Sequence, residues 1–337
     1  MSRRRIVLLL LSLTVALILI SGTSFWFIHA HLSQPFQGFS GEAQIFVSRG
    51  ESARDIADLL EEAGAISSAR LFRCYLRYLG DGYFLQTGEY RFHGPLSPIQ
   101  VAEKLHRGEV HRYKITLPEG LSLEEVAERL ESEGFGKRDR FLQLVAEPDL
   151  ISDLDPEAED LEGYLYPETY YFTFDTDEEE ILRTLTNGFR SVWTPQRRLR
   201  AEELGLTLRQ TLSLASLVEK ETALPAERPL ISAVFHNRLQ RNMRLECDPT
   251  VIYAVRQVKE FDGIIHQSDL ELDSPYNTYK YAGLPPGPIA NPGRDSIDAA
   301  LRPAFVEYLY FVAKKDGSHF FSTNYRDHHR AVLDYQR

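Results

Sequence analysis

The sequence predicts an α+β fold that follows a single N-terminal transmembrane helix. Three observations lead to this prediction: a long uncharged apolar run near the N-terminus, three strand–turn–helix units after it, and a longer second part in which helical patterns alternate with short β-like runs. We expect five segments in chain order: a cytoplasmic tail (1–5), a transmembrane helix (6–28), a linker (29–41), a small α/β subdomain (42–114) and a larger mixed α/β domain (115–337).

The apolar run covers residues 6–28 and contains no charged residue. At about 1.5 Å per residue its 23 residues cover the hydrocarbon core of a bilayer, which is about 30 Å thick. Arg3, Arg4 and Arg5 precede it, and the positive-inside rule places this end in the cytoplasm. The alternative is a cleaved signal peptide, but the run is longer than the usual apolar core of about 7–15 residues and no clean Ala-x-Ala site follows. We therefore expect an uncleaved anchor.

The composition excludes several classes of protein. The chain of 337 residues is 43% hydrophobic and 26% charged, with a formal net charge of −11. Residues 1–41 hold three basic residues and no acidic one, so the rest has 35 Lys and Arg against 49 Asp and Glu, a net −14. Such an acidic chain is a poor nucleic-acid binder, and its apolar content argues against disorder. Two cysteines exclude a disulfide scaffold, although pairing of Cys74 with Cys247 stays open.

Three similar helical units follow the linker. Each begins at a serine suited to cap a helix and ends at a glycine: residues 52–64, 97–108 and 122–134. Short β-like runs precede two of them, at 45–50 and 115–120, and an aromatic-rich helix and a strand (88–92) fall within residues 70–92. The pattern resembles the LysM module, which binds glycans that contain N-acetylglucosamine. The alternative is a common packing unit without a ligand.

Residues 147–180 are acidic and interrupted by prolines. We predict that the charge runs 153–160 and 175–180 are solvated loops or helix starts. Four tyrosines lie between them, and they fit either a β-core or the wall of a sugar-binding groove: Tyr164, Tyr166, Tyr170 and Tyr171.

Residues 207–223 are the most informative helical pattern. Thr207 is a suitable N-cap, and one helical face carries Leu208, Leu212, Ala215 and Glu219. A carboxyl at the end of an apolar face is partly desolvated, and desolvation favours the protonated form that a general acid needs. Glu221 lies about 200° further round the helix. The alternative is that Glu219 only marks the end of the buried face, with its carboxylate in solvent.

The residues that follow this helix indicate an ordered, irregular loop. Segments 274–279 (SPYNTY), 283–289 (GLPPGPI) and 291–293 (NPG) are dense in proline and glycine, which fix backbone angles. Loops rich in Asn, Thr and Tyr are typical of a ligand-facing rim, and the alternative is a structural connection. The sequence carries no phosphate-binding, zinc-protease or serine-hydrolase motif, and its histidines do not cluster at metal-ligand spacings.

Together these segments resemble the endolytic murein transglycosylase (YceG-like) family over nearly the whole chain. The segments that carry the resemblance are 162–167 (EGYLYP), 218–222 (VEKET), 237–239 (NRL), 248–253 (DPTVIY), 276–279 (YNTY), 283–289, 291–293, 310–312 (YFV), 317–319 (GSH) and 321–323 (FST). The chain departs from the family pattern at His236 and at Glu246 and Cys247. None of these touches the expected catalytic carboxyl.

The resemblance implies that Glu219 is a general acid and base in a larger YceG-like catalytic domain. The implied reaction cleaves the β-1,4 bond between N-acetylmuramic acid (MurNAc) and N-acetylglucosamine (GlcNAc) within peptidoglycan strands and leaves a 1,6-anhydro end. The sugar's own C6 hydroxyl attacks C1, so one carboxyl suffices, whereas a hydrolase needs two. No metal and no cofactor is expected.

The remaining site candidates are positioning groups. Six residues are candidates for holding the sugar: Asn237, Asp248, Thr250, Tyr276, Asn277 and Tyr279. Glu221 either holds a local network or is solvated, and Asp248 could instead cap a helix that begins at Pro249.

By this resemblance the protein is a single-pass protein of the bacterial inner membrane, with its catalytic domain outside the cytoplasm. Its expected partners are peptidoglycan strands, the membrane through residues 6–28 and cell-wall synthases, beside which it ends nascent strands; nucleic acid is excluded. Two other functions stay open: a non-catalytic LysM-like wall-binding scaffold, and a glycoside hydrolase that pairs Glu219 with Asp248 or Glu221.

Overall fold

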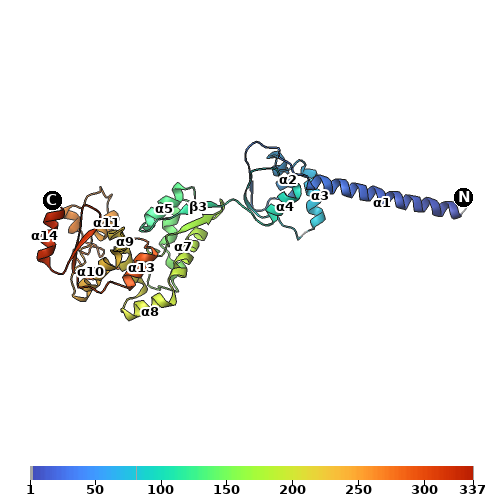
Figure 1. The fold of residues 1–337 in the computed structure, drawn as a ribbon. Coiled ribbons are helices and arrows are strands. Elements are labelled where there is room, and N and C mark those ends of the chain that lie inside the picture. Colours follow the sequence, from blue (N-terminus) through green and yellow to red (C-terminus); the bar gives the residue numbers. More distant parts are fainter. Residues whose placement is uncertain (1–2, 81, 337) are drawn as a thin grey trace. The chain divides into compact units, whose positions relative to one another are not determined.

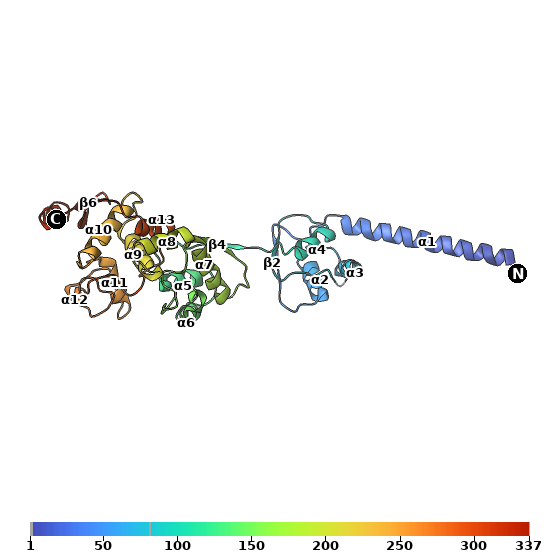
Figure 2. The same cartoon turned by 90° about the horizontal axis from the view of Figure 1, so that it is seen from below.

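The computed structural model describes residues 3–80 and 82–336. The chain forms two compact units. The N-terminal unit comprises the chain up to Tyr113 together with Phe172–Asp175, and the C-terminal unit comprises Lys114–Tyr171 and Thr176–Arg337. Figure 1 shows the elements of each unit along the sequence, and Figure 2 shows them from below.

The chain begins with the long helix α1 (Arg3–Ser33). Its part Leu11–Ser33 is long and apolar enough to cross a membrane, a test that a signal sequence also passes. The helix continues through residues 29–33, which the sequence predicts to belong to the linker. Leu32 near its end is buried.

The N-terminal unit packs three helices on a two-stranded sheet. Strand β1 (Ala43–Val47) pairs antiparallel with β2 (Gly88–Phe92), so that Ala43 lies opposite Phe92. The helices are α2 (Ala53–Glu62), α3 (Ala69–Leu79) and α4 (Pro98–His106). Ser52 and Ser97 form capping boxes at α2 and α4, which confirms the predicted helix starts. The core includes Leu60, Phe72 and Tyr90.

The C-terminal unit is mainly helical. Its helices are α5 (Leu123–Ser132), α6 (Arg138–Val145), α7 (Glu178–Val192), α8 (Pro195–Glu203), α9 (Leu208–Glu221), α10 (Arg228–Gln240), α11 (Asp248–Arg256), α12 (Gln267–Leu270), α13 (Arg294–Leu301) and α14 (Tyr325–Tyr335), with a 3-10 turn at Pro148–Ile151. Strand β3 (Tyr113–Thr116) pairs with β4 (Thr169–Phe172), and β5 (Tyr310–Ala313) with β6 (His319–Ser322).

Helix α9 is the central helix of this unit. It packs against α8, α10, α11 and α13 (Figure 2). Leu212 and Ala215 of the predicted apolar face are buried, but burial extends beyond that face, because residues 211–218 are all buried and every side of the helix is covered there. Thr207 and Gln210 form the predicted capping box at its start. The packing of α9 therefore holds its last turn, which contains Glu219, at a fixed position at the edge of the core.

The acidic segment before α7 is less solvated than predicted. Asp155 is buried, where it accepts hydrogen bonds from Arg209 and from the Tyr164 hydroxyl. Tyr164 is itself buried, as are Tyr166 and Tyr170, which supports a core role for all three. Only Tyr171 among the four tyrosines is exposed. Asp177, in the second charge run, caps α7 as expected of a helix start.

Candidate active site

Glu219 lies in the last turn of α9 with its side chain only 6% exposed. Its Oε1 accepts a hydrogen bond from Arg228 Nη2 at 3.0 Å, and its Oε2 accepts one from the backbone N–H of Gly293 at 2.9 Å. The alternative that its carboxylate faces solvent is therefore wrong. Both carboxyl oxygens are therefore held in place, one by a guanidinium and one by a backbone N–H.

Arg228 brings a second carboxylate to the same place. The same Nη2 donates to Glu119 Oε2 at 3.2 Å, and Nη1 lies 3.5 Å from the exposed Asp295. Glu119 is 44% exposed. Burial and the charge of Glu219 raise the pKa of Glu119, although Arg228 opposes them. Sequence reasoning missed Glu119, because it read residues 115–120 only as a strand and a turn.

Asn291 ties together the loops around Glu219. Its side-chain amide donates to the Leu121 carbonyl at 2.9 Å and to Glu162 at 3.2 Å, and its Oδ1 accepts from the Leu165 N–H at 2.8 Å. Its backbone carbonyl accepts from the Gly120 N–H at 2.9 Å. One buried amide thus joins the loop before α5, the loop before β4 and the loop before α13.

Glu162 is buried beside this amide. Both of its carboxyl oxygens accept from the Leu123 N–H, at 3.1 and 3.2 Å, which satisfies a donor at the start of α5. Burial raises the pKa of Glu162 to about 8. A buried carboxyl of this kind is stable as the neutral acid, so it stabilises the loops without adding charge to the site.

Two glycines allow the loops to approach each other. Gly120 has a φ of +79°, which side chains rarely adopt, and a Cβ there would lie 3.4 Å from Glu219 Cγ. Gly293 has no such strain, but a Cβ there would collide with the carboxylate of Glu119. Lys220 adds a contact between α9 and the loop before α5, because its ammonium group donates to the Gly120 carbonyl at 3.0 Å.

Glu221 lies apart from Glu219, as the helical spacing predicts. Its carboxyl accepts from Cys247 Sγ at 2.9 Å, and burial, with the charge of Asp248, raises its pKa to about 7. The alternative that Glu221 is solvated is therefore wrong, and it holds a local network. Cys247 is free and buried, and Cys74 in the other unit is free and exposed.

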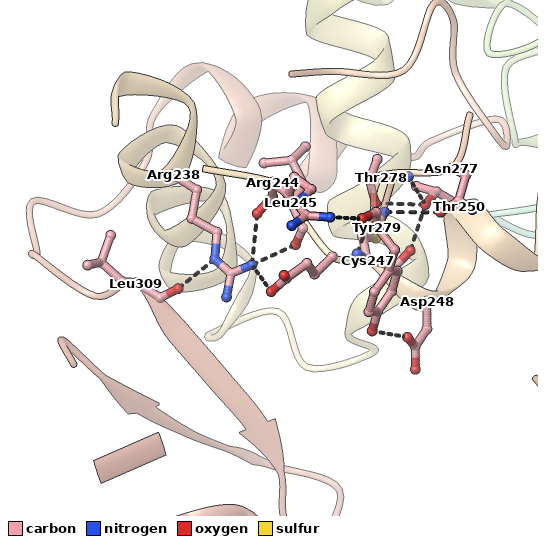
Figure 3. Close-up of polar contacts among 11 residues, drawn as sticks. Arg238, Arg244, Leu245, Cys247, Asp248, Thr250, Asn277, Thr278, Tyr279 and Leu309 are labelled. Carbon is pink, nitrogen blue, oxygen red and sulfur yellow. Dashed lines mark hydrogen bonds and ion pairs between the residues drawn. The ribbon is translucent and has the colours of Figure 1, made fainter. Parts of the chain in front are cut away.

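Asp248 is the first residue of α11 and does not cap it. It accepts a hydrogen bond from the Tyr279 hydroxyl at 2.6 Å instead, as Figure 3 shows. The alternative role of Asp248 as a helix cap is therefore wrong. Tyr276, from the same loop, is half-buried with its ring 4.8 Å from that of Tyr253.

The other three positioning candidates are buried or half-buried and bonded within the protein. The Thr250 hydroxyl donates to the Cys247 carbonyl at 2.7 Å (Figure 3). The Asn277 amide donates to the carbonyls of Leu272 and Leu270 at 2.9 and 3.0 Å. The Asn237 amide donates to two more carbonyls, both at 2.9 Å. Through these donors the three residues hold loops in place, and their contact with a sugar stays a prediction.

Arg238 is a structural residue that sequence reasoning did not single out. Its guanidinium is buried and donates to the carbonyls of Leu309 and Leu245 and to the carboxylate of Glu246 (Figure 3). It also lies over the Tyr310 ring. In the sequence Arg238 stands out only as part of the segment 237–239 (NRL), which does not reveal its charge partner Glu246.

Comparisons with known proteins give a consistent result. The profile of the YceG-like family matches residues 45–334. The chain is 34% identical to an endolytic murein transglycosylase of Bacillus subtilis (strain 168) over 310 residues, which cover 86% of this chain and 84% of that protein. It is 30% identical over 319 residues to an endolytic murein transglycosylase of Streptococcus pneumoniae serotype 2 (strain D39), of which it spans 57%. A crystal structure of a yceG-like protein from Listeria monocytogenes, 32% identical, superposes with a TM-score of 0.59 and covers 87% of this chain and all of that one.

Proposed function

The chain belongs to the YceG-like family, and on that premise we propose that it is an endolytic murein transglycosylase with Glu219 as its general acid and base. It cleaves the MurNAc-β-1,4-GlcNAc bond inside glycan strands and leaves 1,6-anhydro-MurNAc ends. The observation that carries the assignment of Glu219 is its geometry. It is a nearly buried carboxyl at the end of the central helix, held by one guanidinium and one backbone amide.

The proposed reaction needs only this carboxyl. The protonated Glu219 donates its proton to the glycosidic oxygen as the C1–O bond breaks. The C6 hydroxyl of the same MurNAc forms the new bond to C1, and its proton passes to the Glu219 carboxylate. Between these steps Arg228 and the Gly293 N–H stabilise the negative carboxylate. The carboxyl ends protonated, ready for the next strand.

We also propose that α1 is an uncleaved anchor with the N-terminus in the cytoplasm, preceded by Arg3, Arg4 and Arg5. Both units then lie outside the cytoplasm of a bacterial inner membrane. There the enzyme ends nascent strands beside the cell-wall synthases. The capped strand–turn–helix units of residues 42–114 support a LysM-like, glycan-binding role for this part. An inactive Glu219→Gln variant is then expected to sediment with insoluble peptidoglycan.

Digestion of purified peptidoglycan tests the activity. Mass spectrometry of the products is expected to find anhydro ends with the wild-type chain and at least about a hundredfold less product with Glu219→Gln. Glu128→Gln, an exposed carboxyl on the outer face of α5, is the matched control and is expected to keep full activity. Wild-type activity in Glu219→Gln would overturn the mechanism, and no release by the wild type would favour the wall-binding scaffold.

A two-carboxylate hydrolase is the second candidate, and the contact of Glu119 with Arg228 favours it. The second carboxylate would be Glu119, since Asp248 and Glu221 are bonded to Tyr279 and Cys247. A hydrolase adds water to C1, so digestion in ¹⁸O-labelled water would give labelled reducing ends. The transglycosylase leaves unlabelled anhydro ends.

A further inference from the structure

We propose that Glu119 is a positioning residue for Glu219: it shares the guanidinium of Arg228 with the catalytic carboxyl and so allows Glu219 to take up the proton that it donates. The inference rests on the proposed function of Glu219. It explains how the guanidinium of Arg228 stays paired while Glu219 alternates between its protonated form and its carboxylate form.

The geometry sets up a competition for one nitrogen. Arg228 Nη2 donates to Glu219 Oε1 at 3.0 Å and to Glu119 Oε2 at 3.2 Å, so neither carboxylate has the charge to itself. Arg228 is 7% exposed, and its Nε has no hydrogen-bond partner among the described residues. A guanidinium devoted to Glu219 alone would hold it as a carboxylate and oppose protonation.

Two carboxylates and one guanidinium together carry a net charge of about −1, which the uptake of one proton neutralises. Like charges at short range disfavour full ionisation of both, as in other carboxylate pairs. Glu219 is the more buried of the two, and Glu119 is 44% exposed. Burial and the charge of Glu219 raise the pKa of Glu119, so the pair holds one proton more readily than a lone carboxylate, and whichever carboxylate stays ionised keeps the buried cation paired.

Other charged groups face this cluster from three sides. Asp295 at the start of α13 lies near Arg228 but is 65% exposed, so solvent screens it. Lys220 is bonded to a backbone carbonyl. Tyr166 lies near Glu119 and beside Arg294, and burial raises its pKa, so it stays neutral. None of these groups contacts the carboxylate oxygens of Glu219, which leaves Glu119 as the group that competes for Arg228.

The test is the pH profile of kcat for peptidoglycan cleavage by the full chain. In Glu119→Gln the guanidinium keeps Glu219 as its only buried carboxylate partner, beside the exposed Asp295, so the active protonated form is lost at lower pH. We expect the alkaline limb of the profile to move down by roughly one pH unit, with about tenfold lower activity at neutral pH. At acidic pH the activity is expected to return to near the wild-type value. Glu119→Asp, which keeps the charge, is expected to keep the wild-type limbs.

Glu128→Gln is the matched control, with an unchanged profile expected. A Glu119→Gln profile lowered by the same factor at every pH, or one that is unchanged, would overturn the inference. So would a limb displaced as far in Glu119→Asp as in Glu119→Gln. If Glu119→Gln does not fold, a Glu119→Asp limb that moves by about one pH unit from the wild-type position overturns the inference. Loss of activity in Glu219→Gln together with unmoved limbs in Glu119→Gln would leave the proposed function standing, whereas an active Glu219→Gln would remove both.

Discussion

The side chain of Asn291 holds three loops of the C-terminal unit together by hydrogen bonds. Its amide is almost fully buried, and each of its polar atoms is bonded to another part of the C-terminal unit. Glu119 and Gly293 lie in two of the loops that it joins, and both border Glu219. The position of the partners of Glu219, the proposed catalytic carboxyl, thus depends on one neutral side chain that takes no part in the proposed proton transfer.

Replacement of Asn291 by alanine is expected to be costly. It leaves the buried Leu165 N–H without its acceptor, which costs about 1–3 kcal/mol, and it removes the side-chain donor to the Leu121 carbonyl, which keeps only the backbone N–H of residue 291. We expect Asn291→Ala to lower the free energy of unfolding by about 3 kcal/mol in urea denaturation. Asn324→Ala, which removes the exposed cap of α14, is the control and should cost about 1 kcal/mol. Equal losses would contradict the role of Asn291.

The buried carboxyls Glu162 and Glu221 predict a stability that falls as pH rises. Burial raises their pKa values from 4.5 to about 8 and about 7, so the folded protein binds more protons than the unfolded chain between those limits. Their contribution is complete below about pH 4.5 and is lost as pH rises to 8. We expect Glu162→Gln, which mimics the neutral acid, to flatten the slope of unfolding free energy against pH. Glu124→Gln, an exposed carboxyl nearby, should leave the slope unchanged.

At the scale of elements, the starts of the helices could be predicted because local residues decide them. The burial of the helices and their side-chain partners could not, because distant parts of the chain decide them. Thr207 and Ser52 were recognisable caps, and the glycine-rich loop before α13 is irregular as expected. The burial of α9 on all sides could not be predicted, because the helices that cover it come from other parts of the sequence. Glu119 was missed for the same reason: it meets Arg228 across more than a hundred residues.

The loop before α13 offers a test of the contact between Glu119 and Arg228 that removes no charge. Gly293 has a φ of −76°, which alanine adopts freely, but a Cβ there collides with Glu119. We expect Gly293→Ala to displace Glu119 from Arg228 and to reproduce the shift in the alkaline limb of Glu119→Gln. The double variant should be no worse than either single one, since both remove one interaction. Gly94→Ala, where a Cβ meets open space, is the control, and additive losses would refute the shared cause.

At the scale of the whole molecule, the proposed anchoring by α1 has consequences for where both units work. If residues 6–28 are an uncleaved anchor with the N-terminus inside, every residue beyond Ser33 lies outside the cytoplasm. The acidic charge of that part then faces the wall, and the enzyme stays close to the membrane surface from which new strands emerge. A cleaved leader would free the same two units to diffuse.

The two cysteines report on topology and burial in one experiment. Cys74 is exposed in the N-terminal unit, whereas Cys247 is buried against Glu221, and burial raises the pKa of its thiol. A membrane-impermeant maleimide added to intact spheroplasts is therefore expected to label the native chain once, at Cys74, and to label Cys247 only after denaturation. Cys74→Ser should abolish labelling of the native protein. Labelled chain that carries an N-terminal tag and sediments with the membrane would fit an uncleaved anchor, while labelling only after lysis would mean that the orientation is reversed.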